Sequence, residues 1–159
     1  MADGSRQGSR TLPALLAAGG GFLFGVLWMD LLFDVQILGG AAESAVEGIT
    51  AYYRRATIEA FPMNRMIAAV MLATLAGSVI QLVRGGADRR LAALALVLVA
   101  VPVALALLRI VPNAMRLGTG AGAFAERREL ARAICFDHLL CAALIVAFVM
   151  VEAVQARRN

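Results

Sequence analysis

Ionisable side chains stand inside or beside the long apolar runs of this chain, where a charge is costly. Asp30 and Asp34 lie four residues apart near the end of one run, and Asp137 and His138 lie together near the start of another. Residues four apart share one face of a helix, so Asp30 and Asp34 point the same way. Histidine changes its charge near neutral pH, which suits His138 to carrying a proton. These residue types together are capable of acid–base chemistry.

Further polar residues mark the edges of the other apolar runs. Candidate ligand-binding or pairing residues, taken together, are Asp30, Asp34, Asn64, Arg65, Arg109, Asn113 and Arg132. Guanidinium groups bind carboxylates as planar forks, so the arginines are able to neutralise the acids. We therefore predict a polar pocket or an ion-pair network in which these residues meet His138 and Asp137.

Three interpretations of this polar set are open at this stage. It is a structural set of ion pairs, a ligand-binding or catalytic site, or a contact surface for a partner protein. Metal binding by His138 with Asp137, Asp30 and Asp34 is chemically possible, but one histidine among carboxylates has no diagnostic spacing. We therefore predict no metal and no cofactor.

Four apolar runs must position these side chains. They cover approximately residues 12–38, 63–83, 91–111 and 133–154, in a chain of 159 residues that is 61% hydrophobic. Each has at least about 20 residues, enough for a helix to cross a hydrocarbon core of roughly 30 Å. Backbone groups in lipid need partners within their own segment, so the runs should be helices. The expected fold is all-α: one domain over residues 1–159, an integral membrane four-helix bundle.

The alternating direction of four spans would bring the polar residues to one side of the membrane. The first helix ends there, the second begins there, the third ends there and the fourth begins there, whereas the opposite half of the bundle is nearly all Leu, Ala, Val and Ile. Charged residues at membrane depth usually face the bundle interior and pair. Pro102, in the third run, predicts a kink, because it leaves the carbonyl of Leu98 without its helical partner.

The first connection, GGAAESAVEGITAYYRRATIEAFP, is long and has apolar residues at helical spacing. It predicts an interfacial helix between the first and second spans, with Tyr52 and Tyr53 at the level of the lipid headgroups. The last connection ends in AERRELAR, which should continue directly into the fourth span.

The charges indicate a membrane partner rather than nucleic acid. All 15 basic residues are arginines, against 11 acids, and they flank the apolar runs instead of forming a basic stripe with aromatics. Seven arginines fall on the side of the termini and eight on the other. Since several of the eight are expected to be paired, we predict cytoplasmic termini and a location in the cell inner membrane.

Two stretches, RIVPNAMRLG and ERRELARAICFDHLLC, resemble the small four-helix membrane family that includes the anthrone-oxygenase-like proteins. The long first connection and FPMNR at the start of the second helix are similar too. The resemblance implies cofactor-independent oxidation of a lipophilic aromatic or quinol substrate. It would make His138, helped by Asp137, the base, with Asn64, Asn113 and Arg109 holding the oxyanion.

Other functions remain open beside this one. The chain is alternatively a non-catalytic membrane subunit or interaction protein of a larger complex, or a transporter of a small solute or protons. Membrane lipid, a lipophilic small molecule and a partner membrane protein or second copy of the chain are the expected partners.

Overall fold

The structure is a computed structural model that describes residues 3–40, 43–84 and 88–158. Within these residues the chain contains helices and connecting turns without a β-strand. The four long rods are α1 (Asp3–Asp34), α3 (Met63–Arg84), α4 (Arg89–Leu105) continued by α5 (Val111–Gly118), and α6 (Phe124–Arg158). All four are long and apolar enough to cross a membrane, which confirms the predicted all-α membrane bundle.

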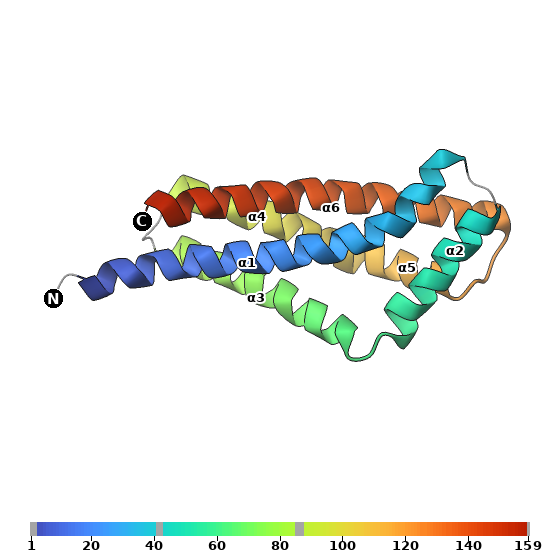
Figure 1. Ribbon diagram of the computed structural model, residues 1–159, viewed down its shortest axis with the longest axis horizontal. Coiled ribbons are helices and arrows are strands. Elements are labelled where there is room, and N and C mark those ends of the chain that lie inside the picture. Colours follow the sequence, from blue (N-terminus) through green and yellow to red (C-terminus); the bar gives the residue numbers. More distant parts are fainter. Residues whose placement is uncertain (1–2, 41–42, 85–87, 159) are drawn as a thin grey trace.

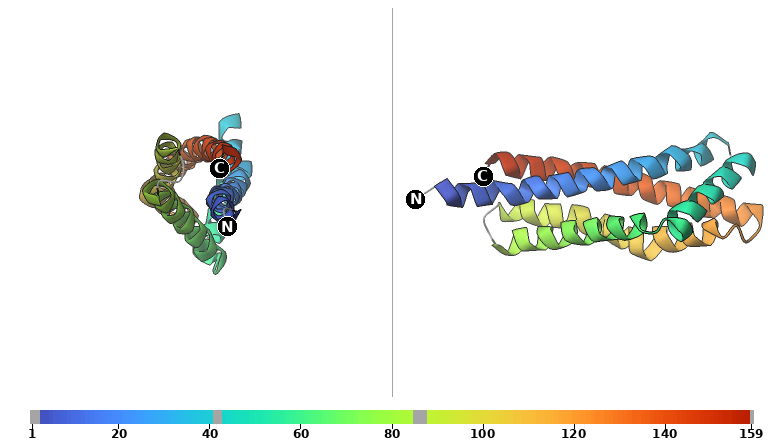
Figure 2. Two further views of the ribbon diagram at one scale, coloured as in Figure 1. Left: turned by 90° about the vertical axis from the view of Figure 1, so that its left-hand side faces the viewer. Right: turned by 60° about the horizontal axis from the view of Figure 1, so that its bottom comes forward.

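The rods lie lengthwise beside one another, with both ends of the chain at the same end of the bundle (Figures 1 and 2). The pair α1 and α6 forms the most extensive helix contact, and α4 packs on α6 and α3. A shorter helix, α2 (Glu43–Tyr53), crosses the opposite end of the bundle, where it contacts α5, α6 and α1. We call this the α2 end, and the other the terminal end.

The third and fourth rods are longer than their apolar runs predict. A π-helical segment, η3 (Ala106–Ile110), follows α4 and leads directly into α5, so this rod continues to Gly118. The segment begins four residues after Pro102, and the N–H of Val111 donates to the carbonyl of Ala106 in the wider π pattern. Helical hydrogen bonding is therefore altered close to the proline, where the sequence predicts a kink. The fourth rod starts at Phe124, as AERRELAR predicts.

Buried apolar side chains form two cores, one for each half of the bundle. The core of the terminal half contains Leu16, Leu23, Val99, Ile145 and Phe148. In that core α1 and α6 approach closely, because a Cβ at Gly20 would lie 2.8 Å from the ring of Phe148. The core of the α2 end is built by α2, α5 and α6 together, and its members include Ile49, Leu117 and Ile134. The short helix is therefore part of the packed molecule.

The first connection differs in detail from the prediction. It does form a helix, α2, followed by a π-helical segment, η2 (Arg54–Glu59), and η1 (Val35–Gly39) precedes it as a 3₁₀ turn. However, Tyr53 is buried at 2% exposure and both tyrosine hydroxyls bind aspartates of α1. Both tyrosines therefore face the bundle rather than lipid, while their expected level, that of the lipid headgroups, stays a prediction.

Candidate functional site

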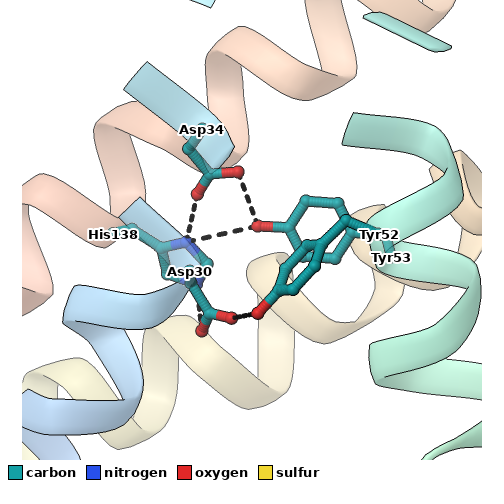
Figure 3. Close-up of polar contacts among 5 residues, drawn as sticks. All are labelled: Asp30, Asp34, Tyr52, Tyr53 and His138. Carbon is teal, nitrogen blue, oxygen red and sulfur yellow. Dashed lines mark hydrogen bonds and ion pairs between the residues drawn. The ribbon is translucent and has the colours of Figure 1, made fainter. Parts of the chain in front are cut away.

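Asp34, His138 and Tyr53 form a buried polar cluster at the α2 end (Figure 3). Nδ1 of His138 lies 2.6 Å from Oδ2 of Asp34, and the hydroxyl of Tyr53 donates to Oδ1 of Asp34 at 2.7 Å. The same hydroxyl lies 3.4 Å from Nδ1 of His138. Asp34 is 0% exposed and His138 3% exposed. Both oxygens of the buried carboxylate are therefore engaged by side chains from two other helices.

Asp30 and Tyr52 complete the cluster on its outer side. The hydroxyl of Tyr52 donates to Oδ1 of Asp30, and Oδ2 of Asp30 lies 3.9 Å from Nε2 of His138. Tyr52 also stacks on Phe33, with ring centroids 4.1 Å apart. The imidazole of His138 thus lies between two carboxylates, and a protonated imidazole would compensate one of their two charges.

The chain brings these residues together from the ends of two helices, α1 and α2, and from the interior of a third, α6. The last turns of α1 supply Asp30 and Asp34 on one face, as their spacing predicts. The chain then reverses through η1, so that the last two residues of α2, Tyr52 and Tyr53, reach back to that face. His138 comes from α6, the main packing partner of α1.

The two phenols lie outside the long rods, and the cluster changes their acidity. Burial, with the carboxylate of Asp34 as a second cause, raises the pKa of Tyr53 above its ordinary value of 10.0. Burial and the carboxylate of Asp30 raise the pKa of Tyr52 in the same direction. Both hydroxyls therefore stay protonated and act as hydrogen-bond donors.

Asp137 does not join this cluster. It forms an ion pair with Arg109, whose Nε lies 3.1 Å from Oδ2 of Asp137, and the Arg109 side chain is 56% exposed. Successive residues of a helix point about 100° apart, so Asp137 and His138 face different neighbours. Asp137 and Arg109 therefore do not share one network with Asp30 and Asp34, as expected from the sequence. They form a separate ion pair at the outer face of the bundle.

The remaining predicted residues also lie elsewhere. Asn64 and Arg65 are exposed at the start of α3, where the Arg65 guanidinium lies 4.8 Å from the centroid of the Phe61 ring. Asn113 is half-buried on α5 and Arg132 is exposed on α6, and within the part of the chain that the structure describes neither forms a hydrogen bond or ion pair with the cluster. The single network expected from the sequence is thus smaller than predicted.

Sequence reasoning missed the tyrosines as members of the site. Their hydroxyls are the donors that saturate the two aspartates. Buried carboxylates need such donors, and a Tyr-Tyr pair on the connection that follows them along the chain was the available signal.

A second buried polar set lies at the terminal end, in the half expected to be nearly all apolar. Nε2 of Gln81 on α3 donates to Glu152 at 3.1 Å and to Gln155 at 3.3 Å, both on α6. Glu152 is 0% exposed, and Ser78 on α3 is buried next to this set. The spacing of Thr74, Ser78 and Gln81 along one helical face was the signal for it.

The geometry of the α2-end cluster is that of a closed set of contacts. The oxygens of Asp34, both nitrogens of His138 and both phenols all face partners within the cluster. Among the residues that the structure describes, no group of three or more His, Cys, Asp or Glu side chains is placed to hold a metal ion. What this arrangement does is fix α2 to α1 and α6.

Comparison with known proteins corrects the expected resemblance. The matching family is one of membrane chaperones, so the anthrone-oxygenase-like assignment is wrong, and with it the oxidoreductase activity and the basis for catalytic roles of His138 and Asp137. The family description names the ER membrane, which does not support the expected inner-membrane location. No curated protein and no solved structure matches the chain. The match to the SHR3 chaperone family, described as ER membrane protein SH3, covers residues 13–155, and the chain therefore belongs to this family.

Proposed function

We propose that this protein is a non-catalytic membrane chaperone that binds partner membrane proteins through their spanning helices. Membership of a family of membrane chaperones supports this proposal. Since the family is described as an ER membrane protein, we place this activity in the ER membrane.

The observation that carries the proposal is the open first half of α3. No residue of 63–73 is buried, whereas Thr74, Ser78 and Gln81 in the second half are. In Figure 1 the start of α3 lies apart from the other rods, next to the end of the segment that follows α2. Val70 and Met71 pack against the core of the terminal half, so the turns before them, residues 63–69, leave apolar surface for a helix of another protein.

The side chains at this surface suit a variable partner. Met63 and Met66, both in the open half of α3, are about half exposed. Methionine is flexible and polarizable, and surfaces that bind many different partners use it often. Binding through such side chains requires complementary apolar area rather than one fixed sequence.

The Asp–His–Tyr cluster has a supporting role in this proposal. It anchors Tyr53 at the end of α2, and η2 leads from there to the start of α3 at Met63. The position of the open half of α3 therefore depends on the anchor.

We also propose that both termini face the cytoplasm. Four spans put the two termini on one side of the membrane. On the opposite side Arg109 pairs with Asp137 and Arg116 pairs with Glu126, so these arginines count less as topological signals.

Site-specific photocrosslinking tests the chaperone proposal. A photoreactive residue replaces Met66, and a matched one replaces Val97, which is 58% exposed on α4. A membrane protein with several spanning helices is then synthesised in membranes that contain either variant. We expect crosslinks to the new protein from position 66 and few from position 97. Tyr53→Phe, which removes one anchor contact, should reduce the yield at position 66.

Two results would contradict the proposal. Equal yields at both positions would show only random encounter in the membrane. Crosslinks at position 66 to lipid alone, with the new protein present, would show that the open half of α3 faces the bilayer.

A further inference from the structure

Exposed arginines gather at the terminal end of the bundle. Five of them come from three helices: Arg84, Arg89, Arg90, Arg157 and Arg158. In the described parts of 84–90 and 150–158, Asp88 is the one exposed acid, and it caps α4 by accepting from the N–H of Arg90 at 3.0 Å. We call these five residues the arginine rim. It combines five guanidinium groups with one exposed carboxylate.

Packing brings the rim residues to one level of the bundle. Gln81 of α3 bonds Glu152 at 3.1 Å and Gln155 at 3.3 Å, so the last turns of α3 and α6 are tied together. Arg84 follows Gln81 by three residues, and Arg157 and Arg158 follow Gln155 at the end of α6. Arg89 and Arg90 begin α4, which packs against both α3 and α6 (Figure 2).

Within the described residues none of the rim arginines has a side-chain partner, whereas three arginines of the α2 end do. At the α2 end Arg109 pairs with Asp137 at 3.1 Å, Arg116 with Glu126 at 3.0 Å, and Arg54 donates to the carbonyl of Gly118 at 3.2 Å. For the five rim guanidinium groups the described residues provide no such contact. Their charges are therefore available to something outside the chain.

Two rim residues are also poorly placed for the stability of their own helix. Arg84, Arg157 and Arg158 lie in last turns, where a positive charge favours the helix dipole. Arg89 and Arg90 occupy the first two positions of α4, where a positive charge opposes the dipole. The stability of α4 therefore does not account for a pair of arginines at these positions.

We propose that the arginine rim binds the phosphate groups of anionic phospholipids in the leaflet at the terminal end. The rim lies where three apolar rods leave the membrane, which is the level of the headgroups. Guanidinium groups bind phosphate through two parallel hydrogen bonds, and clusters of basic residues beside spanning helices attract anionic lipid. This site is independent of the proposed chaperone function.

Thermal unfolding of the full chain in a neutral detergent tests the site. Phosphatidylglycerol or phosphatidylcholine is added in increasing amounts, and the Tm is followed by circular dichroism. A ligand that binds the folded state raises the Tm. For the unsubstituted chain we expect a rise of at least about 3 °C with phosphatidylglycerol and much less with phosphatidylcholine.

Variants at the two ends locate the effect. Replacing all five rim arginines by Gln should abolish the difference between the two lipids. A control variant replaces three exposed arginines of the α2 end and should leave the difference between the two lipids unchanged; its substitutions are Arg55→Gln, Arg128→Gln and Arg132→Gln. If the fivefold variant fails to fold, Arg89→Gln with Arg90→Gln serves instead, because removing charges that oppose the dipole does not harm α4. This double variant should lower the lipid effect at least twofold.

Several outcomes would overturn the proposal. Equal rises with both lipids would show that the effect is not one of headgroup charge. An undiminished response of the rim variants would place the lipid elsewhere. The same rise with inorganic phosphate would identify a site for free phosphate instead of a lipid.

Discussion

Asp34 is the residue on which the α2-end cluster depends most. Its two oxygens accept from Tyr53 and lie against His138 in a site that water does not reach. Asp34→Ala removes the carboxylate that both buried partners bind, so we expect the free energy of unfolding to fall by about 3 kcal/mol. Asp30→Ala, at the part-exposed outer side, should cost clearly less. Thermal unfolding in detergent measures the loss of stability in both variants. Equal losses would contradict the expectation that the more deeply buried aspartate contributes more.

The two tyrosines allow a second test at this scale, because the chain has no others. Their pKa values are raised above 10.0 by burial, so the native protein should show no phenolate absorbance as the pH passes 10.0. In the unfolded chain the phenols lose their protons near 10.0, so the free energy of unfolding should fall as the pH rises above that value. Below pH 10.0 the contribution of the two phenols to the free energy of unfolding does not change with pH.

Tyr53→Phe provides the control for this pH dependence. The variant removes one of the two titrating groups, so its stability should fall less steeply with pH above 10.0. Appearance of the absorbance of two phenolates near pH 10.0 in the folded protein would show that neither hydroxyl is held by its aspartate.

Among the elements, the contact of α5 with the end of α2 leaves no spare space. A Cβ at Gly118 would lie 3.0 Å from the backbone nitrogen of Arg54 and 3.1 Å from the carbonyl of Tyr53. Backbone atoms cannot move aside as a flexible side chain does, so Gly118→Ala should lower the free energy of unfolding by about 1–3 kcal/mol.

Gly48 offers a matched substitution within α2 itself. A Cβ there meets nothing within 4 Å, and the residue is exposed in the helix interior. Gly48→Ala should therefore raise the free energy of unfolding by about 0.5–1 kcal/mol. Chemical or thermal unfolding of the two variants compares them directly. A loss in both would mean that α2 tolerates no change, and a gain in both would mean that α5 does not approach α2 closely.

For the molecule as a whole, four spans predict that residues at the two ends of the bundle face opposite sides of the membrane. Both native cysteines, Cys135 and Cys141, are buried, so single reporters can be introduced without removing them. In sealed vesicles an impermeant maleimide should label Arg158→Cys from one side and Thr119→Cys only from the other. Labelling of both from the same side would contradict four complete spans.

The sequence predicts those features of this molecule that depend on residues close together in the chain, and fails for contacts between distant segments. The spans follow from composition alone, since lipid leaves the backbone no alternative to helices. The pairing of Asp30 and Asp34 follows from spacing on one helix. The membership of the cluster does not follow from spacing. Tyr53 reaches Asp34 only because α2 folds back onto α1 and α6, and this depends on the packing of three helices.

The second polar set shows the same limit. Thr74, Ser78 and Gln81 share a helix face, which spacing reveals, but their partner Glu152 is on a helix far along the chain. Nothing in the local pattern tells a polar residue that faces a buried partner from one that faces lipid. Tertiary packing makes that distinction.

The length of α6 has a practical consequence for visualising the protein. Its 35 residues extend about 52 Å, some 20 Å more than a hydrocarbon core of about 30 Å. Its first turns, AERRELAR, are strongly charged and precede the apolar run, and α6 packs with α5 and α2 at this end, so we expect this part to extend beyond the hydrocarbon core. An antibody fragment raised against this projection would add enough ordered mass for a 16.7 kDa particle to be aligned in electron cryomicroscopy.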